Sequence, residues 1–105
     1  MERQYHEAIY EYVFGNVPEL PFSEQHRKGI DFALTSLDEL TFGIMMYRFK
    51  DGMTSKEIAA LEGISTSNVS QRIRNAAANM RKPLLRRFME RGFEGMESPE
   101  FGDWE

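Results

Sequence analysis

Small polar and basic side chains recur at spacings of three and four residues just after residue 65, and they are of the types that hydrogen-bond to DNA. Residues three and four apart lie on one side of a helix, so these groups would face a partner together. Hydroxyl, amide and guanidinium groups reach base edges in the major groove, where Gln pairs with adenine and Arg with guanine. The residues of this predicted DNA-facing side are Thr66, Ser67, Ser70, Gln71 and Arg74.

Further polar and basic residues flank that side and are expected to contact phosphates. Asn68 and Arg72 lie beside it, and Arg81 and Lys82 follow at the end of the same segment. Phosphate contacts fix the register of a protein on DNA, whereas base contacts give specificity. For Arg81 and Lys82 a second role stays open, because cations at the end of a helix also complement the negative end of its dipole. An ordinary polar surface is the alternative for every residue named so far.

The segment that would present these residues begins at Thr54 and predicts two helices joined by a tight turn. Thr54 precedes Glu57 by three residues, which is the spacing of a capping box. Gly63 stands where a left-handed residue would end the first helix without a Cβ clash. Ser65 or Thr66 would cap the second helix, since their hydroxyls accept from N–H groups two or three residues later.

The apolar residues of the same segment are spaced for burial. In the second helix they are Val69, Ile73, Ala76 and Met80, and in the first helix they are Ile58, Ala59 and Leu61. A helix of about two turns is not stable alone in water, so the first helix must pack on neighbouring elements. The segment is therefore predicted to be a helix-turn-helix whose second helix lies in the major groove of DNA.

The chain also contains the run aromatic–x–x–Gly–x–Thr–x–x–Glu–Ile–Ala, followed by Gly–Ile–Ser and then Val. With this run, the chain from Leu37 to about Lys82 resembles region 4 of the sigma-70-type RNA polymerase sigma factors. The matching residues are Leu37, the segment YRFKDGMTSKEIAALEGIS from Tyr47 to Ser65, Val69, Arg72, Ile73 and Ala76. A generic helix-turn-helix would share only the last part of the run.

The resemblance implies a function and two partners. It implies that the second helix recognises the −35 promoter element in double-stranded DNA, and that the domain docks on the flap of the RNA polymerase β subunit. By position it implies base contacts from Thr66, Ser67, Ser70 and Gln71, with Arg72 and Arg74 beside them. Family members often carry Arg or Lys at some of these early helix positions, where this chain has Thr and Ser. The target sequence therefore stays open, and weaker phosphate anchoring is expected at the helix start.

No segment resembles sigma region 2, and the residues before Leu37 do not resemble sigma sequence. The resemblance thus implies a stand-alone regulator, of the sort carried by phages and conjugative elements of Gram-positive bacteria. We expect an all-α fold, a small helical domain with a C-terminal helix-turn-helix. Supporting helices are expected in residues 1–36, the region 4-like domain in 37–91, and an acidic, disordered tail in 92–105.

Three helices are expected before the helix-turn-helix, and one after it. The first spans residues 2–14 and ends at Gly15, the second is capped by Ser23 and breaks near Thr35, and the third spans about 38–50. Their inward residues are predicted to be Tyr5, Ile9, Tyr12 and Val13 in the first, Ile30, Ala33, Leu34 and Leu37 in the second, and Leu40, Ile44 and Tyr47 in the third. Pro83 should stop or kink the recognition helix, because proline lacks the N–H donor and restricts the residue before it.

Composition limits the function classes. The 105 residues carry a net charge of −4, yet residues 54–91 hold eight Lys/Arg and three Asp/Glu, so the positive charge lies on the predicted DNA-binding segment. No cysteine is present, which excludes disulfides and thiolate metal sites. His6 and His26 lack partners at metal spacing and are expected to be exposed or to cap helices. We expect no enzyme activity, no cofactor, no metal and no membrane segment, and a cytoplasmic location.

Two functional classes remain open at this point. The first is a sequence-specific DNA-binding transcription regulator that also contacts RNA polymerase. The second is a protein-interaction module that binds RNA polymerase or another regulator without recognising DNA; the Thr/Ser-rich helix start and the negative net charge keep it open. The sequence leaves the oligomeric state and the direction of regulation open.

Overall fold

The computed structural model describes residues 5–15, 22 and 24–91, which contain six α-helices. They are α1 (Tyr5–Phe14), α2 (Glu24–Leu34), α3 (Glu39–Phe49), α4 (Ser55–Glu62), α5 (Thr66–Met80) and α6 (Pro83–Arg91). No strand occurs within these ranges, and the expected all-α fold is confirmed. The predicted cap at Ser23 and the predicted disordered tail in 92–105 lie outside the described residues.

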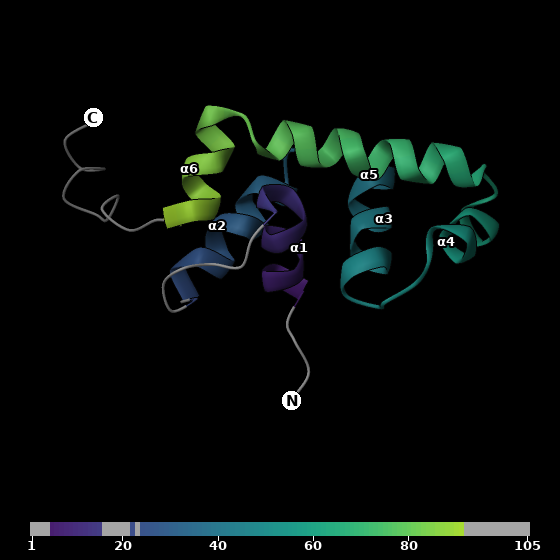
Figure 1. The fold of residues 1–105 in the computed structure, drawn as a ribbon, viewed down its shortest axis with the longest axis horizontal. Helices are drawn as coiled ribbons and strands as arrows, with labels where there is room; N and C mark the ends of the chain where they lie inside the picture. Colours follow the sequence, from purple (N-terminus) through teal and green to yellow (C-terminus); the bar gives the residue numbers. More distant parts are fainter. Residues whose placement is uncertain (1–4, 16–21, 23, 92–105) are drawn as a thin grey trace.

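The helices are arranged along α5, which runs the length of one edge of the molecule (Figure 1). Helices α3 and α4 lie against the N-terminal half of α5, whereas α1, α2 and α6 gather at its C-terminal end. Helix α6 turns back from the end of α5 and packs on α2. Different sets of helices therefore pack against the two ends of α5.

One hydrophobic core connects all six helices, because each contributes apolar side chains at helical spacing. Its fully buried members include Ile9 of α1, Ile30 and Leu34 of α2, Ile44 and Met45 of α3, Ile58 of α4, Val69 and Met80 of α5, and Met89 of α6. The four predicted inward residues of α5 are all buried, and so is Ala77, which lies beside them.

The helix-turn-helix, α4 and α5, is built from the local signals that the sequence predicts. The capping box is complete: Thr54 Oγ1 accepts from the Glu57 N–H at 3.1 Å, and Glu57 Oε1 accepts from the Thr54 N–H at 2.8 Å. Gly63 ends α4 with φ 70° and ψ 31°, the left-handed conformation. Of the two candidate caps of α5, Ser65 is the one used, and its Oγ accepts from the Asn68 N–H at 3.0 Å.

Three predictions about side-chain burial were wrong. Leu61 is 56% exposed, although it lies only three residues after the fully buried Ile58. Tyr12 is 42% exposed, and its ring lies on that of Phe49 with centroids 5.3 Å apart rather than in the core. His6 and His26 were expected to be exposed or to cap helices, and the expectation of exposure is wrong, since both are 8% exposed.

The junction of α5 and α6 follows the prediction for Pro83. Helix α5 ends at Met80 and α6 begins at Pro83, the first helical position, where the missing N–H costs no hydrogen bond. Helix α6 then packs Met89 into the core and sets Phe88 on Phe32 of α2, with ring centroids 4.4 Å apart.

Helices α1 and α2 are joined by a polar cluster at Asp31. Its Oδ1 accepts from the Tyr5 hydroxyl at 2.8 Å and lies 2.9 Å from His6 Nε2. Burial, together with the hydrogen bond to Asp31 and its charge, raises the pKa of Tyr5 to about 12. The cluster therefore favours the neutral phenol.

Candidate nucleic-acid interface

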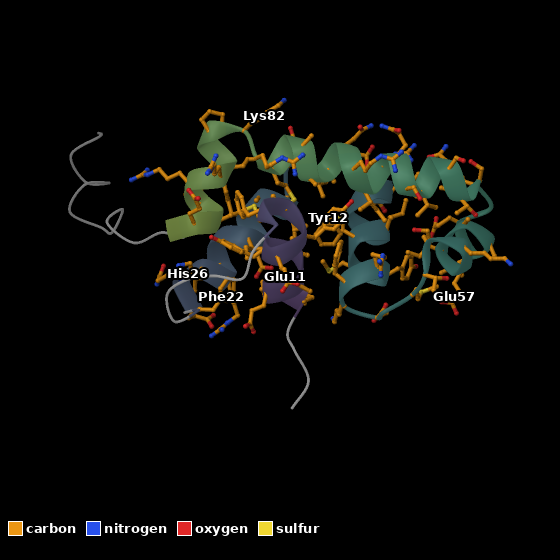
Figure 2. All side chains as sticks on the ribbon, in the orientation of Figure 1. Glu11, Tyr12, Phe22, His26, Glu57 and Lys82 are labelled. Atoms are coloured by element: carbon orange, nitrogen blue, oxygen red, sulfur yellow. The ribbon has the colours of Figure 1, made fainter. Side chains whose placement is uncertain are left out.

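The predicted DNA-facing residues lie along one side of α5, next to its buried side. Thr66, Ser67, Gln71 and Arg74 are exposed and Ser70 is half-buried. We call these five residues the recognition face. Figure 2 shows side chains with nitrogen and oxygen tips along the outer edge of α5, away from the other helices. The face is thus available to a partner without any rearrangement of the fold.

Hydrogen bonds along the helix order part of the recognition face. Arg74 Nη2 donates to Gln71 Oε1 at 2.9 Å, and Gln71 Nε2 donates to Asn75 Oδ1 at 2.8 Å. Asn75 is exposed beside the face, and the sequence analysis did not include it. Its position four residues after Gln71 was the available signal, because side chains at that spacing meet on a helix.

The flanking residue Arg72 points toward α3. Its Nε donates to Asn68 Oδ1 at 2.8 Å and its Nη1 donates to Thr41 Oγ1 at 3.1 Å, while Nη1 lies 3.6 Å from Asp38 Oδ2. Hydrogen bonds from Thr41 and, to a smaller extent, the charge of Arg72 hold the pKa of Asp38 below its usual range. Asp38 is therefore an anion facing this flank of the recognition helix.

The side chains of Arg81 and Lys82, which follow α5, point in different directions. Arg81 Nη1 donates to the Val13 carbonyl oxygen at 2.9 Å, and so satisfies an acceptor in the last turn of α1. Lys82 is exposed and extends outward at the junction of α5 and α6 (Figure 2). Lys82 is therefore the one of this pair that points away from the protein.

Helix length determines which of these groups can reach bases together. The 15 residues of α5 span about 22 Å, whereas the major groove is about 12 Å wide. If α5 lay in a major groove, its first turns with Thr66, Ser67, Ser70 and Gln71 would fit there. The cations beyond its C-terminus would then lie near the flanking sugar-phosphate backbone.

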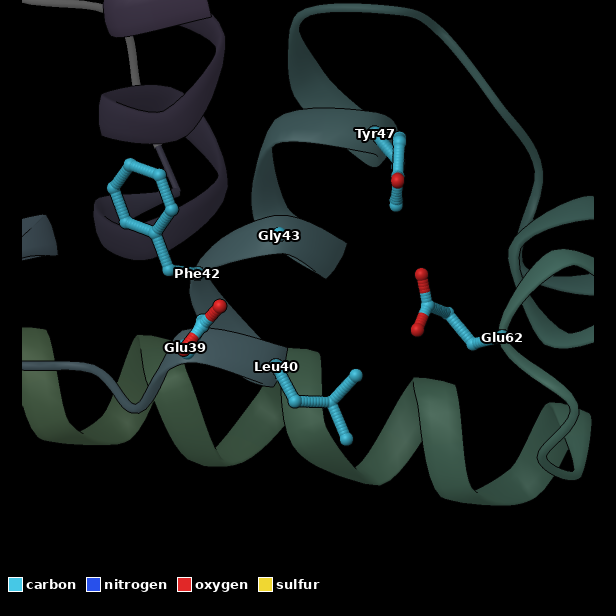
Figure 3. A pocket seen from close by; sticks show the side chains of 6 residues that line it. All are labelled: Glu39, Leu40, Phe42, Gly43, Tyr47 and Glu62. Atoms are coloured by element: carbon cyan, nitrogen blue, oxygen red, sulfur yellow. The ribbon is translucent and has the colours of Figure 1, made fainter.

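A hollow of about 570 Å³ lies on another surface, between α3 and the end of α4. Its lining combines apolar and acidic side chains: Glu39, Leu40, Phe42, Gly43, Tyr47 and Glu62. Figure 3 shows Leu40 of α3 and the Glu62 carboxylate of α4 extending into the space between the two helices. This surface is separate from the recognition face and is suited to a partner with apolar and basic groups.

The described part of the chain contains neither a cluster of metal-binding side chains nor a membrane-spanning helix. No group of three or more His, Cys, Asp or Glu side chains within it could hold a metal ion. None of its helices is both long enough and apolar enough to span a bilayer.

Comparison with known proteins agrees with this geometry. Residues 33–82 match the family model described as Sigma-70, region 4, a range that contains the whole of α3, α4 and α5. No curated protein and no solved structure matches the chain. Helices α1 and α6 and most of α2 lie outside the matched range, so the helices around the C-terminal end of α5 are the part that the family model does not account for.

Proposed function

Because the chain is a sigma-70 region 4-like helix-turn-helix protein, we propose that it regulates transcription by binding a specific sequence in duplex DNA. The recognition face enters the major groove, and its hydroxyl, amide and guanidinium groups contact base edges. The observation that carries this proposal is the exposure of that face on the second helix of the helix-turn-helix, with its hydrogen-bonding groups directed outward.

Each part of the interface has a separate role in this proposal. Gln71 and Arg74 supply the strongest base-edge donors, and the hydroxyl groups before them contact bases or sugars at the groove wall. Lys82 contacts phosphates of the flanking backbone, and its exposure at the end of α5 supports this role. Arg81 lies in the same basic stretch and also ties α1 to the recognition helix.

Substitution of Arg74 tests the groove assignment. We expect Arg74→Ala to weaken binding to a selected duplex by about tenfold or more, since a good bidentate contact contributes about 1–3 kcal/mol of discrimination. The matched control is Lys28→Ala, which removes one exposed positive charge from α2, on another part of the molecule. Affinity is measured by fluorescence anisotropy over a range of salt concentrations, on the selected duplex and on a scrambled one.

The two variants separate a specific contact from a general charge effect. Arg74→Ala should lower affinity for the selected duplex more than for the scrambled one, and Lys28→Ala should change both little. Equal affinities for wild type, Arg74→Ala and Lys28→Ala on the selected duplex would contradict the placement of α5 in the groove.

A second function is favoured by the hollow between α3 and α4. We propose that this surface binds RNA polymerase, in the manner that a region 4 domain docks on the β flap. Leu40 and Tyr47 supply apolar contact area, and Glu39 and Glu62 would select a partner with basic groups at its rim. None of the residues that line this surface belongs to the recognition face.

The polymerase contact is tested with Tyr47→Ala and Glu62→Arg. Both variants should lose binding to core RNA polymerase, measured by biolayer interferometry, and should retain wild-type affinity for the selected duplex. If the polymerase is bound but neither change affects it, a different surface makes the contact. Polymerase binding by a wild-type protein that binds no DNA at low salt would favour the interaction module over the DNA-binding regulator.

A further inference from the structure

We propose that Arg72 is a positioning residue, which fixes the rotation of α5 on α3 through Asp38 and Thr41 and so determines which bases the recognition face meets. The inference rests on the proposed DNA binding and adds a source of specificity that lies outside the recognition face. Phosphate contact, the role predicted from sequence, is the competing assignment for the same side chain.

The guanidinium of Arg72 connects two helices by directional contacts. Within α5 it donates to Asn68 at 2.8 Å, and across the helix interface it donates to the Thr41 hydroxyl at 3.1 Å. Thr41 is 8% exposed, so its hydroxyl is fixed by the surrounding packing. The planar fork of an arginine can bond in two directions at once, which the single ammonium group of a lysine does less well.

Asp38 makes this contact part of the start of α3. It is the N-cap residue of α3, and its Oδ1 accepts from the Thr41 N–H at 2.7 Å. Its other oxygen, Oδ2, lies 3.6 Å from Arg72 Nη1. The Asp38 carboxylate therefore caps α3 and also attracts the Arg72 side chain of α5. The position of the first turn of α3 thus constrains the rotation of α5.

The recognition helix needs such a contact because its apolar packing is not directional. Val69 and Ile73 are buried on one side of α5, and hydrogen bonds, whose distances and angles are restricted, add a directional constraint to that packing. One residue step turns a helix by about 100°, so a contact held at Arg72 sets the direction in which the adjacent Gln71 points.

A second contact lies on the same flank two turns later. Asn79 Nδ2 donates to Ser36 Oγ at 3.0 Å, in the turn between α2 and α3. Between the two contacts runs a groove of about 290 Å³. Its lining residues are Ser36, Leu37, Asp38, Thr41, Arg72, Asn75, Ala76 and Asn79. Polar contacts thus hold this side of α5 at two points, and Arg72 is the one beside the recognition face.

Arg74 is the natural comparison, since it is the same residue type on the same helix. Arg74 donates a hydrogen bond to Gln71 of its own helix, and its side chain is exposed. A positioning arginine and a DNA-contacting arginine should respond differently to the same substitution. Arg72→Lys and Arg74→Lys keep the charge and remove the planar fork, so they form a matched pair.

The experiment uses the full chain and two duplexes, one selected from a random library and one scrambled. Affinity is measured as a function of salt for wild type, Arg72→Lys, Arg72→Ala, Arg74→Lys and Asp38→Asn. Asn is as good an N-cap as Asp, so Asp38→Asn keeps the start of α3 and removes only the charge that faces Arg72. Circular dichroism confirms that each variant retains its helices.

The positioning role predicts a loss of specificity at constant phosphate contact. Arg72→Lys and Asp38→Asn should each reduce the ratio of specific to scrambled affinity by about tenfold, the size of one mismatched base pair. The dependence of scrambled binding on salt should stay as in wild type. A phosphate contact predicts the opposite: Arg72→Lys keeps the specificity ratio, Asp38→Asn tightens binding to both duplexes alike, and Arg72→Ala reduces the salt slope by about 0.9.

Wild type and variants separate the two levels of the proposal. Equal affinity of wild type for both duplexes would overturn the DNA-binding function, and with it the positioning role. A wild type that prefers the selected duplex, with an unchanged ratio in both Arg72→Lys and Asp38→Asn, would overturn the positioning role alone.

Discussion

The helix-turn-helix and the helices that support it differ in what specifies their structure. In α4 and α5, bonds between neighbours in the sequence set the boundaries: the capping box at Thr54, the left-handed Gly63 and the cap at Ser65. In α1, α2 and α6, the contacts join distant residues, as in the bond from Arg81 to Val13 and the ring pair of Phe32 and Phe88.

This difference separates two tasks within one small fold. The helix-turn-helix, which we propose faces DNA, has helix boundaries set by short-range signals. The supporting helices carry fewer such signals, namely the left-handed Gly15 after α1 and Pro83 at the start of α6. Their position depends mainly on burial of apolar side chains in the shared core. Substitutions in the two regions should therefore have effects of different size and kind.

The largest effect is expected from the core of the supporting helices. Leu34 is 1% exposed, so Leu34→Ala should lower the free energy of unfolding by about 2–5 kcal/mol. Leu61→Ala makes the same change at a 56% exposed site of α4 and should stay within about 0.5 kcal/mol of wild type. Urea denaturation measures both, and equal losses would show that Leu61 is part of the core.

An effect of intermediate size is expected at the turn between α4 and α5. Gly63 has φ 70° and no atom within 4 Å of an added Cβ, so Gly63→Ala should cost about 1–2 kcal/mol through the backbone alone. Gly43 lies inside α3, also in open space and without a positive φ. Gly43→Ala should instead raise stability by about 0.5–1 kcal/mol. Changes of the same sign in the two variants would contradict this account of the turn.

Loss of the capping box should have a smaller effect. Thr54→Ala removes the acceptor for the Glu57 N–H and should cost about 1 kcal/mol. Because this signal is local, hydrogen exchange should become faster in the first turn of α4 and stay as in wild type in α2. Faster exchange spread evenly over both helices would show that the helix-turn-helix is not specified locally.

The smallest effects on stability are expected from changes of pH. The helix-turn-helix should lose stability in acid, and the supporting helices should lose it in alkali. A hydrogen bond from the Thr54 N–H holds the pKa of Glu57 below its usual range. Its stabilisation is therefore present above the unfolded pKa, about 4.3, and is lost as the pH falls through the folded pKa. Tyr5 has its pKa raised from 10 to about 12, so its contribution is present below pH 10 and is lost as the pH rises toward 12.

Thermal unfolding of Glu57→Gln and Tyr5→Phe checks these signs. Glu57→Gln should reduce the fall of Tm in acid and leave the alkaline side as in wild type. Tyr5→Phe should reduce the fall of Tm between pH 10 and 12 and leave the acid side unaffected. If Glu57→Gln changed only the alkaline side and Tyr5→Phe only the acid side, the hydrogen-bonded environments described for the two side chains would be wrong.

The sequence predicted the parts of the structure that depend on neighbours in the chain. Both boundaries of α4, the start of α5 and the break at Pro83 follow from residue types at fixed spacings, and so does the buried side of α5. The partners of Arg72 and Arg81 could not be predicted in this way. Arg81 bonds to a carbonyl 68 residues earlier in the chain, and that distance closes only when α1 packs on α5.

The wrong predictions of side-chain burial also arise from packing between helices that are distant in the sequence. Leu61 and Tyr12 fit the apolar pattern of their helices, but the pattern does not say how far neighbouring helices cover each side. In the opposite case, a polar residue expected to be exposed is buried: His6 lies against Asp31, a residue of another helix. Exposure of the recognition face could be predicted without knowing how the other helices pack. Its residues lie off the apolar positions of α5, and only Ser70 is half-buried.

Selection of bound duplexes from a random DNA library, at low and at moderate salt, tests the central claim most directly. The account predicts that wild type enriches a defined motif, and that Gln71→Ala and Arg74→Ala lose preference at particular positions within it. No enrichment by wild type, with no binding even at low salt, would contradict the proposal that α5 recognises DNA.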